Sequence, residues 1–216
     1  MLAAILVGIG EYLLHYCAQA RFSVSGYDFL LDTPVQRTTI GHFSGVFGAT
    51  LYPVGCYHIY LMLRPANHRL AFSVFVVGAS GFIVGAVWIG SRASITVLVQ
   101  LDQTAQIMKA IELYDLRYET LLQVVRLTTL YVSVVIVWLS WNGRSHYPRW
   151  IGLFNPIDLI ILNFIVFMLF PAVGKHTMPI ALNVAFSIFF IVSLACALKV
   201  SYIDNQHDQA GKLSQR

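Results

Sequence analysis

Charged side chains are scarce in this sequence. Asp, Glu, Lys and Arg make up 11% of its 216 residues, whereas hydrophobic residues make up 57%. A soluble globular domain carries about 25% charged residues, because its surface must interact favourably with water. With so few charges the chain cannot cover a water-exposed surface, so most of its surface is expected to face lipid. The composition therefore excludes an ordinary soluble domain and indicates an integral membrane protein.

The sequence also lacks the short motifs that mark common chemistries. It contains no GxSxG, no HExxH, no P-loop and no dinucleotide-binding fingerprint. Its cysteines, Cys17, Cys56 and Cys196, form no CxxC or CxxxC pair, which excludes a zinc ribbon or a dithiol redox motif. All three lie inside apolar runs, where we interpret them as small buried hydrophobic residues.

A basic patch is missing as well, although the formal net charge is +4. Proteins that bind nucleic acids gather Lys and Arg on one face. Here these residues are scattered at the ends of apolar runs, as they are beside transmembrane segments. We therefore expect no nucleic-acid partner and take membrane lipid as the expected partner.

Long apolar runs define the fold class. A spanning helix needs about 20 mostly apolar residues, and backbone groups in hydrocarbon must be hydrogen-bonded within the protein. No ten-residue alternation of the kind seen in membrane barrels is present. We predict an all-α polytopic transmembrane bundle of six helices, forming a single domain over residues 1–216. The predicted spans are residues 2–18, 40–63, 70–90, 121–141, 151–173 and 177–200.

The first run also has features of a secretory signal peptide. Residues 18–20, Ala-Gln-Ala, fit a small-x-small cleavage site. However, no basic side chain precedes the run, and Glu11 and His15 interrupt its apolar stretch. We therefore favour a retained transmembrane helix.

An additional amphipathic helix is predicted between the third and fourth spans. Apolar residues recur there at spacings of three to four, at Leu101, Ala105, Met108 and Ile111. The segment is interpreted either as an interfacial helix leading into the fourth span or as a lid over a site.

Six spans place both termini on one side of the membrane, which we call the near side. The near side then carries the short loops 64–69 and 142–150 and the polar tail after residue 200. The near side has a slight excess of Lys and Arg, which predicts that it is cytoplasmic.

Pairs of small residues predict close helix contacts. Gly41 and Gly45 lie four residues apart in the second span, and Gly81 and Gly85 repeat the spacing in the third. This small-xxx-small pattern lets helix backbones approach closely in membranes. It favours a compact bundle and carries no information about chemistry.

Two ionisable residues share one face of the first predicted helix. Glu11 and His15 are four residues apart, which places them one helical turn apart. Ionisable groups in hydrocarbon cost several kcal/mol each and often mark function. Three interpretations stay open: a polar clasp between helices, a proton relay, or two ligands of a metal ion.

Further polar side chains fall at related depths in the predicted bundle. Asp158 lies near the middle, like Glu11, and a cavity that opens to the far side would collect these groups. We predict Glu11, His15 and Asp158 as catalytic residues. The predicted substrate-binding residues are His42, Arg126, Asn163 and Asn183.

The chain resembles an uncharacterised bacterial family of small six-helix membrane proteins. The resemblance rests on five features: Gly10-Glu11, His42 with Gly45, Tyr147-Pro148-Arg149-Trp150, Asn155-Pro156 and Asn183. The family pattern has Asp at the position of Glu11. The resemblance implies six helices and a bacterial inner membrane, and it implies no activity, substrate or cofactor.

The leading hypothesis is a membrane protein with an intramembrane polar pocket that binds a small amphipathic or lipid-like molecule. A lipid-modifying enzyme is the first choice, and whether the pocket carries out chemistry is left open, as are its metal and cofactor. A proton-coupled small-solute transporter and a non-catalytic accessory or sensor subunit are the alternatives. The short chain and the missing internal repeat count against a transporter, although a homodimer could compensate for them.

Overall fold

The computed structural model describes residues 1–16, Tyr27 and residues 30–214, with side chains up to Tyr202. Within these ranges every regular element is a helix, which confirms the all-α prediction. Cys17 and most of the loop that follows it lie outside the described residues. The elements are α1 (Leu2–His15), α2 (Val35–Ala49), α3 (Tyr52–Leu63), α4 (His68–Val99), α5 (Ala105–Trp141), η3 (Arg149–Phe154), α6 (Pro156–Leu169), α7 (Pro171–Thr177), η4 (Met178–Ile180) and α8 (Ala181–Ser214).

Four helical stretches in the described ranges are long and apolar enough to cross a membrane. They are Val35–Leu63, His68–Val99, Ala105–Trp141 and Pro171–Tyr202. This finding supports a multi-pass membrane protein. The prediction of six full-length spans is corrected, because α1 and α6 have only 14 residues each. At a rise of 1.5 Å per residue such a helix is about 21 Å long, shorter than the roughly 30 Å hydrocarbon core.

Two local breaks explain why the predicted span 151–173 is not one helix. The side chain of Asn155 accepts hydrogen bonds from the backbone N–H groups of Ile157 and Asp158, so α6 begins only at residue 156. Pro171 lacks a backbone N–H, and α6 ends at Leu169 just before it. Asn155-Pro156 and Pro171 are visible in the sequence as interruptions of the apolar run, but the prediction treated the run as one span.

The helix around the fourth span is longer than predicted. Helix α5 has 37 residues and contains the span 121–141 and the predicted amphipathic helix from Ala105 onward, whereas Leu101 precedes it. No Gly or Pro occurs between Ala105 and Trp141, so nothing in this stretch interrupts the helix. The prediction of a separate amphipathic helix is therefore wrong, and the segment is the first half of α5.

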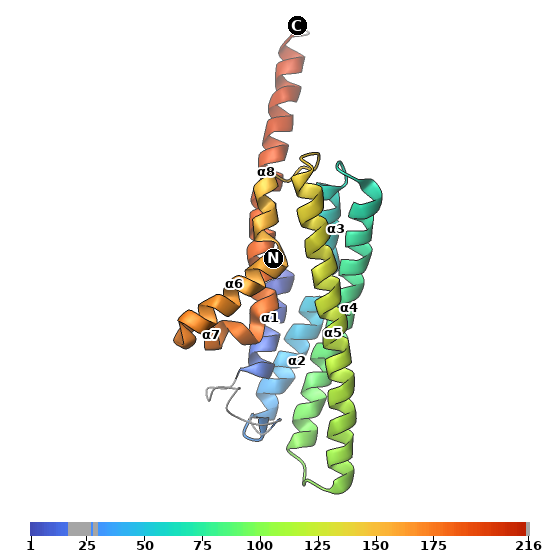
Figure 1. The fold of residues 1–216 in the computed structure, drawn as a ribbon, viewed down its shortest axis with the longest axis vertical. Helices are drawn as coiled ribbons and strands as arrows, with labels where there is room; N and C mark the ends of the chain where they lie inside the picture. The colour runs from blue at the N-terminus through green and yellow to red at the C-terminus, as the bar shows by residue number, and fades with distance from the viewer. Residues whose placement is uncertain (17–26, 28–29, 215–216) are drawn as a thin grey trace.

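The helices form an elongated bundle from which α6 and α7 project sideways (Figure 1). The α3–α4 and α5–η3 connections meet at one end, where the His146 backbone N–H donates to the Met62 carbonyl over 2.9 Å. We call this the near end. Helix α8 continues past it to the C-terminus, whereas the N-terminus lies about midway along the bundle. The side of the membrane that each terminus faces stays a prediction.

Glycine contacts bring α1 and α2 together. A Cβ atom on Gly10 would lie 2.5 Å from the backbone nitrogen of Gly45 and 2.7 Å from the Gly41 carbonyl oxygen. The two backbones therefore touch, in agreement with the close approach predicted from Gly41 and Gly45. This contact holds α1 against the bundle and positions the ionisable residues on its buried face.

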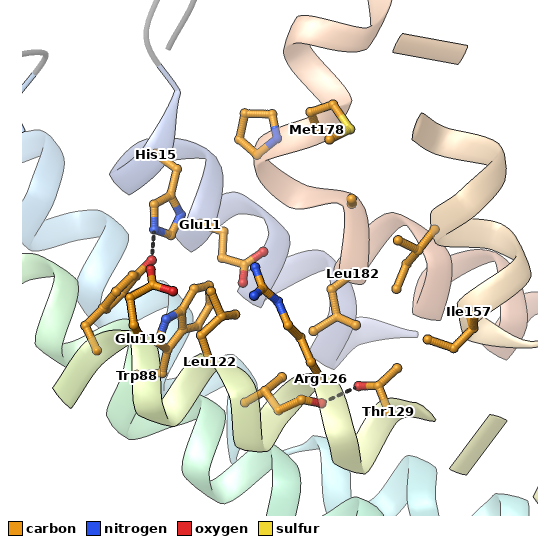
Figure 2. Close-up of a pocket in the computed structure, with 15 residues that line it drawn as sticks. Glu11, His15, Trp88, Glu119, Leu122, Arg126, Thr129, Ile157, Met178 and Leu182 are labelled. Carbon is orange, nitrogen blue, oxygen red and sulfur yellow. Dashed lines mark hydrogen bonds between the residues drawn. The ribbon is translucent and has the colours of Figure 1, made fainter. Parts of the chain in front are cut away.

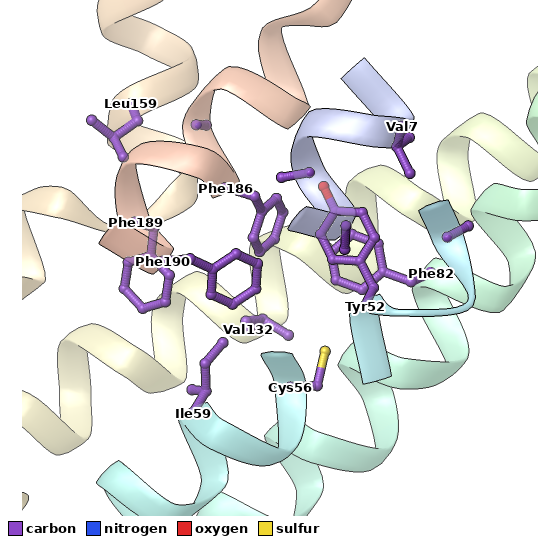
Figure 3. Close-up of a cluster of buried hydrophobic side chains, with 14 of the residues drawn as sticks. Val7, Tyr52, Cys56, Ile59, Phe82, Val132, Leu159, Phe186, Phe189 and Phe190 are labelled. Atoms are coloured by element: carbon purple, nitrogen blue, oxygen red, sulfur yellow. The ribbon is translucent and has the colours of Figure 1, made fainter. Parts of the chain in front are cut away.

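An aromatic cluster fills the core between α3, α4 and α8 (Figure 3). The rings of Tyr52 and Phe82 stack with centroids 3.6 Å apart, and Phe186 contacts both rings edge-on. Stacked and edge-on aromatic pairs contribute about 0.5–1.5 kcal/mol beyond their buried area. The cluster fixes the Tyr52 ring, whose hydroxyl points to the polar groups described below.

The outer surface of the bundle is apolar. On α6, for example, Ile161, Leu162, Phe164 and Met168 are all exposed. An apolar surface of this kind is rare on soluble monomers and is the normal surface of a protein in lipid. The projecting α6–α7 segment therefore fits a lipid environment despite its short helices.

Candidate functional site

A cavity of about 400 Å³ lies among α1, α4, α5, α6 and the start of α8 (Figure 2). This volume falls within the range of small-molecule sites. Its walls are mostly apolar, with Leu122, Val125 and Leu182 among them, and a few polar side chains converge on it. These polar groups come from helices that are far apart in the sequence.

Glu11 forms one wall of the cavity from α1 and is only 3% exposed. Its carboxylate accepts a hydrogen bond from the Asn183 side-chain nitrogen over 2.5 Å, and the Asn183 oxygen accepts one from the Tyr52 hydroxyl over 2.5 Å. A buried carboxylate without partners would be costly. The Tyr52–Asn183 pair therefore holds Glu11 in one orientation at the edge of the cavity.

His15 lies one turn further along α1 and is also buried. Its Nε2 atom is 3.1 Å from the hydroxyl of Tyr118 on α5, and its ring stacks on Trp88 of α4. Trp88 stacks in turn on Tyr118 with ring centroids 5.2 Å apart. Four side chains of the cavity wall, Glu11 among them, thus come from three helices.

The indole N–H of Trp88 is the clearest free donor at the cavity. Its nitrogen is buried and has no hydrogen-bond partner among the residues that the structure describes. Most buried donors in proteins are paired, and leaving one unpaired costs about 1–3 kcal/mol. Since Trp88 lines the cavity, a ligand there is well placed to accept this hydrogen bond.

Behind this wall lies a fully buried arginine. The guanidinium of Arg92 is 4.9 Å from the ring centroid of Tyr27 and 5.3 Å from that of Tyr118, both within cation–π range. Tyr27 donates a hydrogen bond to Asp115, and burial together with this bond raises the Tyr27 pKa. Arg92 therefore packs against the ring of Tyr118, which in turn contacts His15.

Two charged side chains lie at the mouth of the cavity. Glu119 and Arg126 both line it from α5, two helical turns apart, and both are exposed. Figure 2 shows Arg126 extending from α5 across the cavity toward α1, where Glu11 lies. Within the described part of the chain Arg126 forms no ion pair. The mouth thus presents one cation and one anion on α5 that do not pair with each other.

Of the seven predicted site residues, the cavity collects three directly: Glu11, His15 and Arg126. Asn183 belongs to the same arrangement through its hydrogen bond to Glu11. Asn163 is one step removed, because its side chain lies 3.6 Å from the sulfur of Met178, which lines the cavity.

The other two predicted residues lie elsewhere. His42 is half-buried on α2, against Phe43 and beside Gly90 of α4, and does not line the cavity. Asp158 is exposed in the first turn of α6, accepts a hydrogen bond from Asn155 and lines a different cavity. The structure therefore does not bring Glu11 and Asp158 together.

Sequence reasoning missed Trp88 and Tyr118. Aromatic residues make up 13% of the chain, so neither stood out among the others. The sequence did carry a sign that Arg92 is buried, because the apolar segment that forms α4 continues to Val99, beyond the predicted end of the third span.

The site offers hydrogen-bond donors, a carboxylate and an imidazole. Such a set can bind an anionic group and move a proton. Among the described residues no three His, Cys, Asp or Glu side chains gather in the way a metal ion requires.

A comparison with known families identifies the family of the chain. The model of a family described as "Family of unknown function (DUF6796)" matches residues 1–200, which is nearly the whole chain. No curated protein and no solved structure matches the chain.

Proposed function

Since the chain belongs to this family of unknown function, its activity has to be inferred from the site, and we propose that the protein binds an anionic, lipid-like molecule in the cavity beside α1. The ligand's charged group would contact Arg126 and Trp88, and its apolar part would follow the exposed apolar surface between α5 and α6. In the more specific form of this proposal, the protein is an enzyme that modifies the bound molecule.

The observation that carries the proposal is Arg126. An arginine on the lipid-exposed part of a helix costs several kcal/mol unless a partner compensates the charge. Arg126 is exposed and has no such partner among the described residues. The guanidinium binds phosphate and carboxylate groups through two parallel hydrogen bonds, which favours an anionic headgroup.

The buried end of the cavity supports the enzymatic form of the proposal. Glu11 and His15 lie one turn apart at the wall, and each is held by a partner on another helix, Asn183 and Tyr118. A histidine and a carboxylate in fixed positions are the usual means of general acid–base catalysis. Asp158 is left out of this proposal because it lines another cavity.

Native mass spectrometry of the protein released from lipid nanodiscs tests the binding. The discs contain equal parts of phosphatidylglycerol, which is anionic, and phosphatidylethanolamine, which is zwitterionic. We expect the wild type to retain phosphatidylglycerol and Arg126→Gln to retain about tenfold less, because a charge-assisted hydrogen bond contributes about 1.5–3 kcal/mol. Arg64→Gln is the matched control, since Arg64 is exposed at the near end and does not line the cavity.

Equal retention of phosphatidylglycerol by the wild type and Arg126→Gln would overturn the proposal. A change in the mass of the retained lipid over time, absent in Glu11→Gln and His15→Ala, would support the enzymatic form. Binding without any such change would limit the function to binding.

A further inference from the structure

A second and larger cavity lies near the other end of α5. It has a volume of about 600 Å³ and is bounded by the last turns of α5, by η3 and by the start of α6. Ile157 lines both cavities and separates them. Trp141 is the last residue of α5 and the polar Asn142 follows it, so this cavity lies at the near end of the apolar part of the bundle.

Among the residues that the structure describes, Asp158 is the only charged one that lines this second cavity. Asn155 donates a hydrogen bond to one of its carboxylate oxygens over 2.6 Å and donates another to the Gly152 carbonyl. Both N–H groups of the Asn155 amide are therefore used, and Asp158 is exposed. No Lys or Arg of the described chain pairs with it. One carboxylate oxygen is thus left to an outside partner.

Asp158 is not needed to hold the start of α6 in place. It occupies the first turn of α6, where the helix dipole stabilises a negative charge. Its own carboxylate is not needed to cap the helix, because Asn155 accepts the backbone hydrogen bonds there. Capping therefore does not account for the acid at this place in a mostly apolar segment.

Two indole rings line the same cavity. Trp138 and Trp141 are one helical turn apart on α5, so they lie on one face, and both are exposed. A Cβ atom on Gly152 would lie 2.9 Å from the Trp141 indole nitrogen, so this ring packs closely against the η3 backbone. Tryptophan gathers at membrane interfaces for general reasons. Here, however, both rings share a cavity with an uncompensated carboxylate.

We propose that this second cavity binds the ammonium group of a zwitterionic phospholipid. The Asp158 carboxylate would pair with the positive charge, and the faces of Trp138 and Trp141 would surround it. Tryptophan is the best aromatic partner of a cation, and carboxylates with aromatic rings recognise ammonium groups in this way. The cavity lies at the near end of the apolar surface, where headgroups begin, and a lipid there keeps its chains against α5 and α6.

This proposal and the function proposed above differ in the charge of the ligand group that is bound. The first cavity presents Arg126 to an anion, whereas the second presents Asp158 to a cation. One experiment can therefore contradict either proposal while supporting the other.

The test uses the same nanodiscs of phosphatidylethanolamine and phosphatidylglycerol in equal parts. Both lipids carry a phosphate, and only phosphatidylethanolamine carries an ammonium group. Asp158→Asn and Trp138→Leu should each lower the retention of phosphatidylethanolamine about tenfold and leave phosphatidylglycerol unchanged. Asp158→Asn keeps an oxygen that accepts the Asn155 hydrogen bond, so its fold should be maintained. Trp150→Leu is the control, because Trp150 is exposed on η3 and does not line the cavity.

Competition distinguishes a lipid from a free amine. Ethanolamine hydrochloride at millimolar concentration should not displace phosphatidylethanolamine if the acyl chains contribute to binding. Displacement by ethanolamine alone would keep the ammonium site and contradict the lipid as its ligand. Unchanged phosphatidylethanolamine retention in both Asp158→Asn and Trp138→Leu would overturn the site itself, and so would an equal loss in Trp150→Leu.

Discussion

Single hydrogen bonds determine how the polar groups of the first cavity are held. Tyr52 lies in the aromatic core, yet its hydroxyl reaches Asn183, and Asn183 reaches Glu11. The three groups form one line from the core to the cavity wall. Removing a member should therefore affect both stability and the geometry of the site.

Tyr52→Phe tests the hydrogen-bonded chain from Tyr52 through Asn183 to Glu11 at its end in the aromatic core. The substitution keeps the stacked ring and removes the donor, so the Asn183 oxygen is left buried without its partner. We expect the free energy of unfolding to fall by about 1–3 kcal/mol. Thermal unfolding of the detergent-solubilised protein measures the loss. Tyr57→Phe is a matched control on the same helix, because Tyr57 is exposed and should change stability by less than about 0.5 kcal/mol.

Trp88 allows a residue-scale test of ligand contact. Trp88→Phe keeps an aromatic ring in the stack with His15 and Tyr118 and removes the unpaired N–H. Removing the unpaired buried N–H relieves a cost of about 1–3 kcal/mol, which offsets part of the packing lost with the smaller ring, so we expect no large loss of stability. Retention of phosphatidylglycerol in native mass spectra should fall several-fold. Undiminished retention would show that the indole N–H does not contact the ligand.

At the scale of helices, close backbone contact is the main constraint on the site. Helix α1 carries Glu11 and His15, and it reaches its position because Gly10, Gly41 and Gly45 let α1 and α2 touch. Dispersion forces and close packing drive helix association in lipid, where the hydrophobic effect between helices is absent. A small change in this contact should therefore displace the site.

Gly10→Ala tests the α1–α2 contact. The new methyl group would lie 2.5 Å from backbone atoms that cannot move aside independently of their helix. We expect a loss of about 1–3 kcal/mol in stability, as overpacking usually causes. Gly85→Ala is the control, because its methyl group would meet Val125 at an ordinary 3.8 Å. A larger loss in Gly85→Ala than in Gly10→Ala, measured by thermal unfolding, would contradict this account.

The ends of α6 are also decided at the element scale. An Asn cap and a following Pro limit α6 to 14 residues, although the surrounding sequence stays apolar. This short helix places Asp158 in the second cavity and Asn163 beside Met178 near the first. The same break that shortens the helix therefore creates the boundary between the two cavities.

For the whole molecule, the arrangement of the long helices predicts which loops share a side of the membrane. The α3–α4 and α5–η3 connections lie at the near end, and the α4–α5 connection lies at the opposite end (Figure 1). Single cysteines at Asn67, Asn142 and Asp102, in a chain whose own cysteines are replaced by Ala, can be probed with an impermeant thiol reagent. We expect Asn67→Cys and Asn142→Cys to react from one side and Asp102→Cys from the other. Reaction of all three from the same side would contradict the spanning arrangement.

Composition and apolar runs were sufficient to predict the class of the protein. The shortage of charge requires a lipid-facing surface. The apolar runs show where long apolar helices lie, and the residue count along a run gives the depth of each side chain in the membrane. The anomalous polar residues Glu11, His15 and Arg126 were recognisable for the same reason, since each interrupts an apolar run. The Gly41–Gly45 spacing likewise predicted a close helix contact.

Tertiary structure alone decided which of these residues meet. Residue count gives depth, whereas packing against neighbouring helices sets the rotation and tilt of each helix. Glu11 and Asp158 were predicted at similar depths, yet packing directs them into separate cavities. Trp88 and Tyr118 join His15 only because α1, α4 and α5 converge.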